Sequence, residues 1–495
     1  MKPINRYNTP IYNYLREYAE QNMNIFHMPG HKLAKGIPDE LARDVLKLDV
    51  TEVEGTDNLH YPEGIIKQAE ELAADAFGAD KTFFLVNGST CGIQAAIMST
   101  CARGQKIITG RDSHKSVVAG LILSGAEPVY VYPEYNCEFG IAGAISAKSI
   151  EKALNDNADA TAVLITRPNY YGICSDIEEI SRIVHSYNKV LIVDEAHGAH
   201  LAFSRQLPPP ALQYGADISI QSAHKTLAAV TQGAYLHVKG DRVDLDRLSF
   251  NLTMLQTSSP SYIIMSYLDI ARELMVQEGR QKLDNLLKNI QLFKNEMNNY
   301  SEYKILSGNP DKKIFHDPTR LVINIRKLGI SGFAAEKILR GKFRTQIEMA
   351  DFENLALITT IADNGENFSR LLEAMHGLSK MNFENKMIYP NEQLQSIITN
   401  QNRTIDTGFE EMTELNNGSI EMLPWEAYAA QKKDIPFKES EGRISAGIVT
   451  PYPPGVPVLY PGEIIGRQHI RFIAAILEAG GSVNGIDANN IKIVK

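Results

Sequence analysis

Short apolar runs alternate with longer segments of helical periodicity between residues 40 and 250. Runs this apolar are typical of strands that are buried on both faces of a mostly parallel sheet, with helices packed on either side. We therefore predict a doubly wound α/β domain in this half of the chain. Its strands are expected at Lys81–Val86, Lys106–Thr109, Pro128–Tyr132, Thr161–Thr166, Lys189–Val193 and Ala216–Gln221.

Two helices of this domain have recognisable beginnings. The turn Asn87–Thr90 leads into a helical stretch at Cys91–Ala102. The segment Ser175–Glu179 has the composition of a helix cap, and the residues that follow it, Ile180–Tyr187, continue with the helical period. Both helices therefore follow predicted strands, as a doubly wound fold requires.

The rest of the chain divides into smaller parts. The amphipathic pattern of Leu268–Tyr300 predicts one long helix that leads to a smaller domain with strands at 321–325 and 356–361. Asn and Gln are frequent at 383–403, which we interpret as a linker, and the five prolines of Pro451–Pro461 predict a rigid, irregular loop. The predicted divisions are an N-terminal segment at 1–40, a large domain at 41–270, a small α/β domain at 271–382, the linker at 383–403 and a C-terminal α+β domain at 404–495.

Composition and charge narrow the classes of function. Of the 495 residues, 44% are hydrophobic and 22% are charged, which is near the average for globular chains. Lys and Arg total 50 against 59 Asp and Glu, so the formal charge is −9. A mildly acidic chain without a basic block is a poor candidate for binding nucleic acid or an anionic membrane. An acidic balance suits a small cationic substrate.

The cysteine pattern and the hydropathy point to the cytoplasm. The four cysteines form no CxxC pair, and no His–Cys spacing resembles a metal site, so we expect free thiols and no metal. The first thirty residues lack the pattern of a signal peptide, and no uncharged apolar run reaches the roughly 20 residues that span a bilayer.

Three features occur where an open α/β sheet places its ligands. Asp194 follows one predicted strand, Lys225 follows the next, and the turn Asn87–Thr90 precedes a helix. Each has an ordinary explanation alone, as a loop carboxylate, a surface charge or a helix cap, and His114 is by itself more often structural. Together they match pyridoxal phosphate (PLP), which needs a lysine for a Schiff base, a carboxylate for the pyridine nitrogen and an anion site for the phosphate.

With these features the sequence resembles a known family, the Orn/Lys/Arg decarboxylases. The resemblance is to the short bacterial branch of that family, which lacks the N-terminal wing domain. The resemblance implies a fold-type-I, aspartate-aminotransferase-like large domain, and a homodimer or homotetramer with active sites shared between subunits. It runs the whole length of the chain. Its landmarks are Phe26–Lys32, Asp57–Gly64, Asn87–Cys91, Arg111–Ser116, Asp194–His200, Ser222–Thr226, Gln256–Tyr262, Glu348–Asp351 and Pro451–Glu463.

The resemblance also implies roles for individual residues. Lys225 would form the Schiff base, and Asp194 would pair with the pyridine nitrogen. Ala196 and His114 would lie against opposite faces of the ring, and His197 would reach its phenolate oxygen.

Two further groups of residues would hold the phosphate. Within the subunit they are Ser89, Thr90, Ser222 and His224. From the neighbouring subunit they are Thr257 and Ser258.

The implied reaction is decarboxylation of a basic L-amino acid, lysine or arginine and less readily ornithine, to cadaverine, agmatine or putrescine. Asp57–Gly64 and Val86–Thr90 look closer to the lysine branch, with arginine a close second. Either Lys225 or His114 would supply the proton to the α-carbon. Acids for the cationic end of the substrate are Glu463, which we place first, Asp351, Glu348 and Asp57.

The sequence is compatible with two alternatives. The same lysine and aspartate would serve an aminotransferase or a β-eliminating lyase, because the protein selects the bond that is broken by orienting it. A catalytically silent, PLP-binding relative is the second, although the presence of both Lys225 and Asp194 speaks against it.

Overall fold

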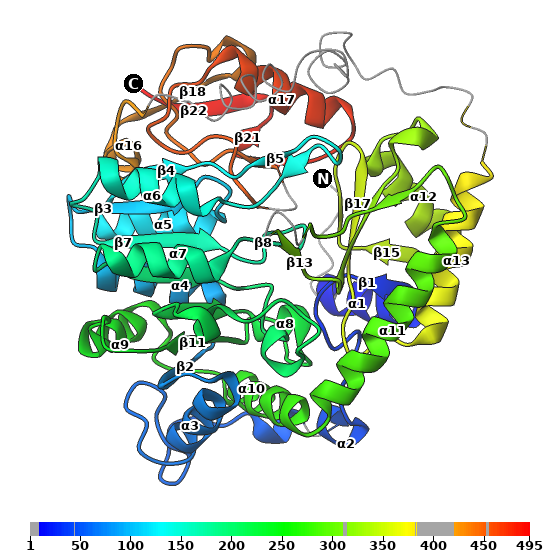
Figure 1. Ribbon diagram of the computed structural model, residues 1–495, viewed down its shortest axis with the longest axis horizontal. Coiled ribbons are helices and arrows are strands. Elements are labelled where there is room, and N and C mark those ends of the chain that lie inside the picture. Colours follow the sequence, from blue (N-terminus) through cyan, green and yellow to red (C-terminus); the bar gives the residue numbers. More distant parts are fainter. Residues whose placement is uncertain (1–8, 44, 310–313, 382, 384–419, 452–454) are drawn as a thin grey trace.

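The computed structural model describes residues 9–43, 45–309, 314–381, 383, 420–451 and 455–495 (Figure 1). They form a large α/β unit, a smaller unit beside it and a C-terminal unit that packs above the large sheet in this view. Except for residue 383, the predicted linker at 383–403 lies outside the described residues.

The large unit contains a seven-stranded sheet with the order β2-β11-β10-β9-β7-β3-β4. Five neighbouring strands, from β10 to β4, are mutually parallel, while β11 is antiparallel to both β10 and β2. The prediction of a mainly parallel sheet is therefore confirmed, and the sequence reading missed only β11. The strands are β2 (Lys81–Leu85), β3 (Lys106–Gly110), β4 (Glu127–Val131), β7 (Ala162–Thr166), β9 (Val190–Asp194), β10 (Ile218–Gln221) and β11 (Ala234–Val238).

Helices cover both faces of this sheet (Figure 1). One face is covered by α4 (Gly88–Thr100), α5 (Lys115–Ser124) and α9 (Leu245–Leu255), and the other by α6 (Ala147–Asp156) and α7 (Ile177–Ser186). Every residue of β10 and β11 is buried, which explains why these strands are apolar without alternation.

The helix predicted at Leu268–Tyr300 exists but begins earlier and is interrupted. It runs as α10 (Tyr262–Leu274), a π-helical turn at Met275–Gly279 and α11 (Arg280–Met297). Figure 1 shows it crossing from the large sheet to the smaller unit. That unit has a four-stranded antiparallel sheet and two helices: β12 (Lys304–Ile305), β14 (Arg320–Asn324), β17 (Asn354–Ile358), β16 (Met349–Ala350), α12 (Gly332–Phe343) and α13 (Gly365–Ser379).

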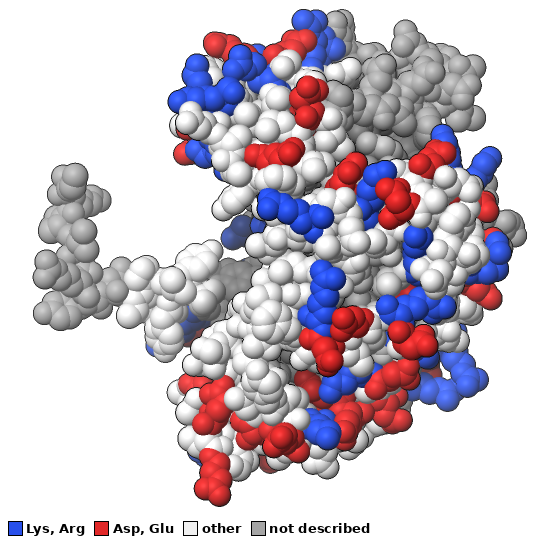
Figure 2. Space-filling model, turned by 90° about the vertical axis from the view of Figure 1, so that its left-hand side faces the viewer, with Lys and Arg blue, Asp and Glu red and all other residues white. Residues whose placement is uncertain are grey.

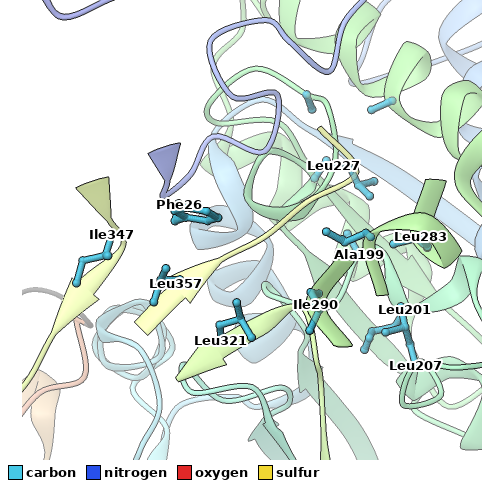
Figure 3. Packing of buried hydrophobic residues seen from close by; sticks show 14 of the residues in the cluster. Phe26, Ala199, Leu201, Leu207, Leu227, Leu283, Ile290, Leu321, Ile347 and Leu357 are labelled. Carbon is cyan, nitrogen blue, oxygen red and sulfur yellow. The ribbon is translucent and has the colours of Figure 1, made fainter. Parts of the chain in front are cut away.

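The N-terminal segment belongs structurally to the small unit. After α1 (Pro10–Glu20), strand β1 (Asn24–Phe26) pairs in parallel with β15 (Thr345–Ile347). Figure 3 shows Phe26 beside Leu357 of the small sheet, in the same buried cluster as Ala199, Leu201 and Leu227 of the large unit. One continuous core therefore joins the N-terminal strand, the small sheet and the loops at the carboxyl edge of the large sheet.

The C-terminal unit has its own core, built by α17 (Arg467–Glu478) against β22 (Asn490–Val494) and its neighbours. Its other elements are α16 (Pro424–Ala429), β18 (Lys432–Pro436), β19 (Thr450–Pro451), β20 (Val483–Asn484) and β21 (Ile486–Asp487). A buried ion pair attaches it to the large unit, where Arg111 contacts Glu463 at 3.0 Å and stacks over the ring of Tyr460 at 3.9 Å.

Charges on the surface are mixed in sign, and Figure 2 shows Lys and Arg interspersed with Asp and Glu on one face. No helix in the described part of the chain is both long and apolar enough to cross a membrane. The remaining helices before the large sheet are α2 (Asp39–Arg43) and α3 (Ile65–Phe77).

Gly30 lies where the N-terminal segment passes closest to the large unit. Its N–H donates to the carbonyl of His224 at 2.7 Å, and its carbonyl accepts from the Thr360 hydroxyl at 2.8 Å. A Cβ at Gly30 would lie 2.4 Å from the backbone oxygen of Leu227. The segment is therefore in contact with the backbone that carries Lys225, and only glycine permits this approach.

We expect Gly30→Ala to destabilise the protein by about 1–3 kcal/mol, because the added methyl group must displace backbone atoms. Gly341→Ala is the matched control, since a Cβ at this helical position meets nothing within 4 Å. The control should be neutral or slightly stabilising. Thermal unfolding of the two variants and the parent chain compares them, and equal midpoints for both variants would contradict this account of Gly30.

Candidate active site

Asp194 and Lys225 meet at the carboxyl edge of the large sheet. Asp194 is the last residue of β9, and Lys225 lies in the short helix α8 (Ala223–Thr226) directly after β10. Since β9 and β10 are parallel neighbours, with Ile220 beside Asp194, their ends bring the two side chains to the same place. The predicted proximity of Asp194 and Lys225 is confirmed by this register.

The amine of Lys225 lies in a buried, mixed-charge environment. Its Nζ is 3.1 Å from Nε2 of His197. Burial lowers the pKa of Lys225, while the carboxylates of Asp194 and Glu348 act in the opposite direction. Burial likewise raises the pKa of Asp194, opposed by the charge of Lys225 and by the N–H of Ala196, which donates to Oδ1 at 3.1 Å.

Two of the predicted phosphate ligands lie together at a helix start. The hydroxyl of Ser222 donates to the hydroxyl of Ser89 at 2.9 Å, and Ser89 is in the first turn of α4. Thr90 follows it and is exposed, whereas the ring of His224 is held on the other side by the carbonyl of Gly233 at 3.1 Å. Free amides and hydroxyls at a helix N-terminus make an anion site.

His114 is the N-cap residue of α5. Its Nδ1 accepts a hydrogen bond from the N–H of Ser116 at 3.2 Å. Burial lowers the pKa of His114 to about 3, and the nearby charges of Lys225 and Lys115 add to the effect. The ring is therefore neutral at ordinary pH. Its electrostatic effect on His197 also places it among the groups around Lys225.

Arg320 and Tyr170 belong to this cluster, although the sequence reading did not single them out. Arg320 donates from Nη2 to Nδ1 of His197, and the ring of Tyr170 meets that of His197 edge-on with centroids 5.0 Å apart. The signal for Arg320 was available, because a charged residue begins the apolar strand 320–324. A fully buried arginine needs a partner, and that requirement marks it as a candidate site residue.

Of the four acids proposed for the substrate, Glu348 is the one that shares the electrostatic environment of Lys225. Its two oxygens accept from the hydroxyl of Tyr170 at 2.6 Å and from the N–H of Met28 at 3.0 Å. Its negative charge raises the pKa of Lys225. Glu348 therefore lies between the N-terminal segment, the small unit and the amine.

The other three acids are engaged elsewhere. Asp351 accepts from Tyr171 at 2.9 Å and organises the turn before β17. Asp57 accepts from four backbone N–H groups of the 58–66 loop, which lower its pKa against the opposing effect of burial. Glu463 is 2% exposed, in its ion pair with Arg111.

Thr257 and Ser258 lie in an exposed loop that follows α9. The carbonyl of Thr257 is 2.9 Å from Nε2 of His60. Among the described residues no hydrogen bond joins this loop to Lys225, so within one subunit it is separate from the other predicted phosphate ligands. If Thr257 and Ser258 contact a cofactor, that cofactor would be bound by another subunit, which is the arrangement expected from the family resemblance.

We expect Lys225 to react with a small aldehyde, in reductive methylation, at lower pH than an ordinary lysine does. Its pKa is lowered, so its neutral, nucleophilic form persists as the pH falls. The charge of Asp194 raises the pKa of Lys225, so Asp194→Asn should move the midpoint of the pH dependence to a still lower pH. Residue-resolved mass spectrometry gives the pH dependence, and a midpoint at or above that of ordinary lysine would contradict the described environment.

Comparison with known proteins agrees with this geometry. Residues 9–308 match the Orn/Lys/Arg decarboxylase major-domain model, and residues 409–489 match the C-terminal domain of the same family. The chain is 35% identical to arginine decarboxylases of Bacillus anthracis and of Bacillus subtilis, over 98% and 99% of its length and 96% and 98% of theirs.

Among solved structures, the chain resembles lysine decarboxylase A from Pseudomonas aeruginosa, with a TM-score of 0.75 at 21% identity. This likeness covers 98% of the chain and 80% of the other, and it supports the predicted fold class. The chain belongs to the Orn/Lys/Arg decarboxylase family, and it is an amino-acid decarboxylase of the fold-type-I class.

Proposed function

We propose that this protein decarboxylates L-arginine to agmatine, with L-lysine as the second candidate and L-ornithine the third. The observation that carries the choice is the name of the relatives that are 35% identical, both arginine decarboxylases, against 21% for the lysine decarboxylase structure. This order gives arginine precedence over the lysine branch favoured by the local segments Asp57–Gly64 and Val86–Thr90.

We infer that the cofactor is PLP, because the residues present fit it. A lysine with a lowered pKa and a buried carboxylate lie together, the buried Ala196 presents only a methyl group, and Ser89 and Ser222 form a hydroxyl pair at a helix start. When bound, PLP supplies an aldehyde for the amine and a ring that accepts electrons. Asp194 would hold a proton at the pyridine nitrogen, and His114 would cover the ring.

The chain's own groups divide the remaining work. Glu348 would receive the cationic end of the substrate, because a guanidinium pairs with a carboxylate through two parallel hydrogen bonds and Glu348 is the candidate acid whose charge acts on Lys225. Lys225 would deliver the proton that replaces the lost carboxyl group on the α-carbon, in preference to His114, since burial leaves the His114 ring without a second proton at neutral pH. The core around Phe26 and Leu227 excludes water from one side of this space.

The alternative reactions are less well supported. An aminotransferase or a lyase would use the same lysine and aspartate, but it would not account for the match of residues 409–489 to the C-terminal domain of the decarboxylases. A silent PLP-binding relative would not need an amine held 3.1 Å from His197 with a lowered pKa.

We also propose that two or more copies assemble with shared sites. On α9 the side chains of Phe250 and Met254 are exposed one helical turn apart, next to the exposed loop of Thr257 and Ser258. Apolar side chains of this size on one surface helix favour contact with another protein. The four cysteines are free, which suits a reducing compartment, and we place the protein in the cytoplasm.

Product analysis tests the reaction. The purified protein, loaded with PLP, is incubated separately with L-arginine, L-lysine and L-ornithine, and the amines are identified by mass. We expect agmatine to dominate, and Lys225→Ala to form none. Cadaverine as the main product would replace arginine by lysine, whereas absence of all three amines from a yellow protein would refute the proposed substrate class.

Glu348→Gln tests the substrate contact. We expect KM for arginine to rise about 10- to 100-fold, because one charge-assisted hydrogen-bonded pair contributes roughly 1.5–3 kcal/mol. Asp351→Asn is the control, since its carboxylate serves a turn, and its KM should stay unchanged. An unchanged KM in Glu348→Gln together with a raised KM in Glu463→Gln would assign the contact to Glu463 instead.

A further inference from the structure

Arg320 begins β14 in the small unit, yet its side chain contacts the large unit. It is 2% exposed, and its Nη2 lies 2.5 Å from Nδ1 of His197. Gly172 makes this placement possible, because a Cβ there would lie 2.7 Å from the Cβ of Arg320. The close approach of Gly172 therefore fixes the position of the Arg320 side chain.

The direction of this hydrogen bond is fixed by chemistry. A guanidinium has N–H donors and no acceptor, so Nδ1 of His197 must be the acceptor. A neutral imidazole carries one proton, which must then be on Nε2. Burial and the surrounding positive charges lower the pKa of His197 well below its ordinary value, so the ring is neutral.

We propose that Arg320 is a positioning residue that fixes the tautomer of His197, so that Nε2–H is the donor that faces Lys225. Nζ of Lys225 lies 3.1 Å from Nε2, and it can accept this hydrogen bond only in its neutral form, which burial favours. The inference rests on the proposed function in one respect, that the same Nε2–H would later donate to the phenolate oxygen of PLP. Without Arg320, the proton can move to Nδ1 and leave Nε2 as an acceptor that repels this oxygen.

The groups around His197 are consistent with this role. Lys225 faces it from α8, Arg320 from β14, and His114 and His224 act on it from α5 and α8. The Tyr170 ring is at its edge. Each of these groups either lowers the pKa of His197 or leaves it unchanged, so none favours a second proton on the His197 ring. Among the described residues Arg320 is the hydrogen-bond donor to Nδ1.

The first experiment uses the protein without PLP. ¹⁵N-histidine NMR reads the tautomer of His197, whose signal is assigned by its loss in His197→Asn. We expect the Nε2–H form in the parent chain and in Arg320→Lys, which keeps a donor and a charge, and a shift towards Nδ1–H in Arg320→Met. The same tautomer in all three proteins would overturn the proposal, whatever becomes of the proposed reaction.

The second experiment is a double-mutant cycle on PLP binding, followed by absorbance. We expect Arg320→Met to weaken binding about 10-fold or more, by loss of a hydrogen bond to a charged oxygen, with rescue in Arg320→Lys. In the His197→Asn background, Arg320→Met should add nothing, because its effect passes through the ring. If the effects of the two substitutions on PLP affinity were fully additive, Arg320 would not act through His197. Equal losses of affinity in Arg320→Lys and Arg320→Met would also refute this role.

Discussion

Asp194 and Lys225 place a carboxylate and an amine together at the edge of a sheet where little water remains. Leaving either charge alone there would cost several kcal/mol, because the surviving group would be buried without a partner. Each therefore stabilises the charged form of the other, while burial pushes both towards neutrality. The parallel pairing of β9 and β10 makes this possible, since it brings the ends of two strands to one point.

The N-terminal segment, the small unit and the C-terminal unit each contact the surroundings of this pair. The N-terminal segment passes through Gly30 and contacts the backbone after Lys225. The small unit contributes Arg320 and Glu348, and the C-terminal unit is anchored by Glu463 on Arg111, three residues before His114. The ion pair thus connects the C-terminal unit to the loop that carries a proposed ring contact, which explains why the acid of that unit is buried rather than available.

What the sequence could reveal follows from this arrangement. Asp194 and Lys225 were predictable as neighbours, because each lies at or just after the end of an apolar strand and parallel strands share an edge. The small unit was expected from its own strands, but its contacts with the site were not. Arg320 and His197 are 123 residues apart, and their meeting depends on how α10 and α11 orient one unit against the other. No local sequence pattern encodes the orientation of the small unit against the large one. A charged residue at the start of an apolar strand does, however, indicate that it has a buried partner.

Acidic residues have several structural uses, and their sequence context does not distinguish these uses. A carboxylate can serve a turn, as Asp57 and Asp351 do through backbone N–H groups, or neutralise an arginine, as Glu463 does. Both uses look identical in a sequence. Glu348 differs because its donors, Tyr170 and the Met28 N–H, come from separate parts of the chain that converge beside Lys225. A carboxylate whose charge acts on the reactive amine is the one placed to distinguish a cationic substrate.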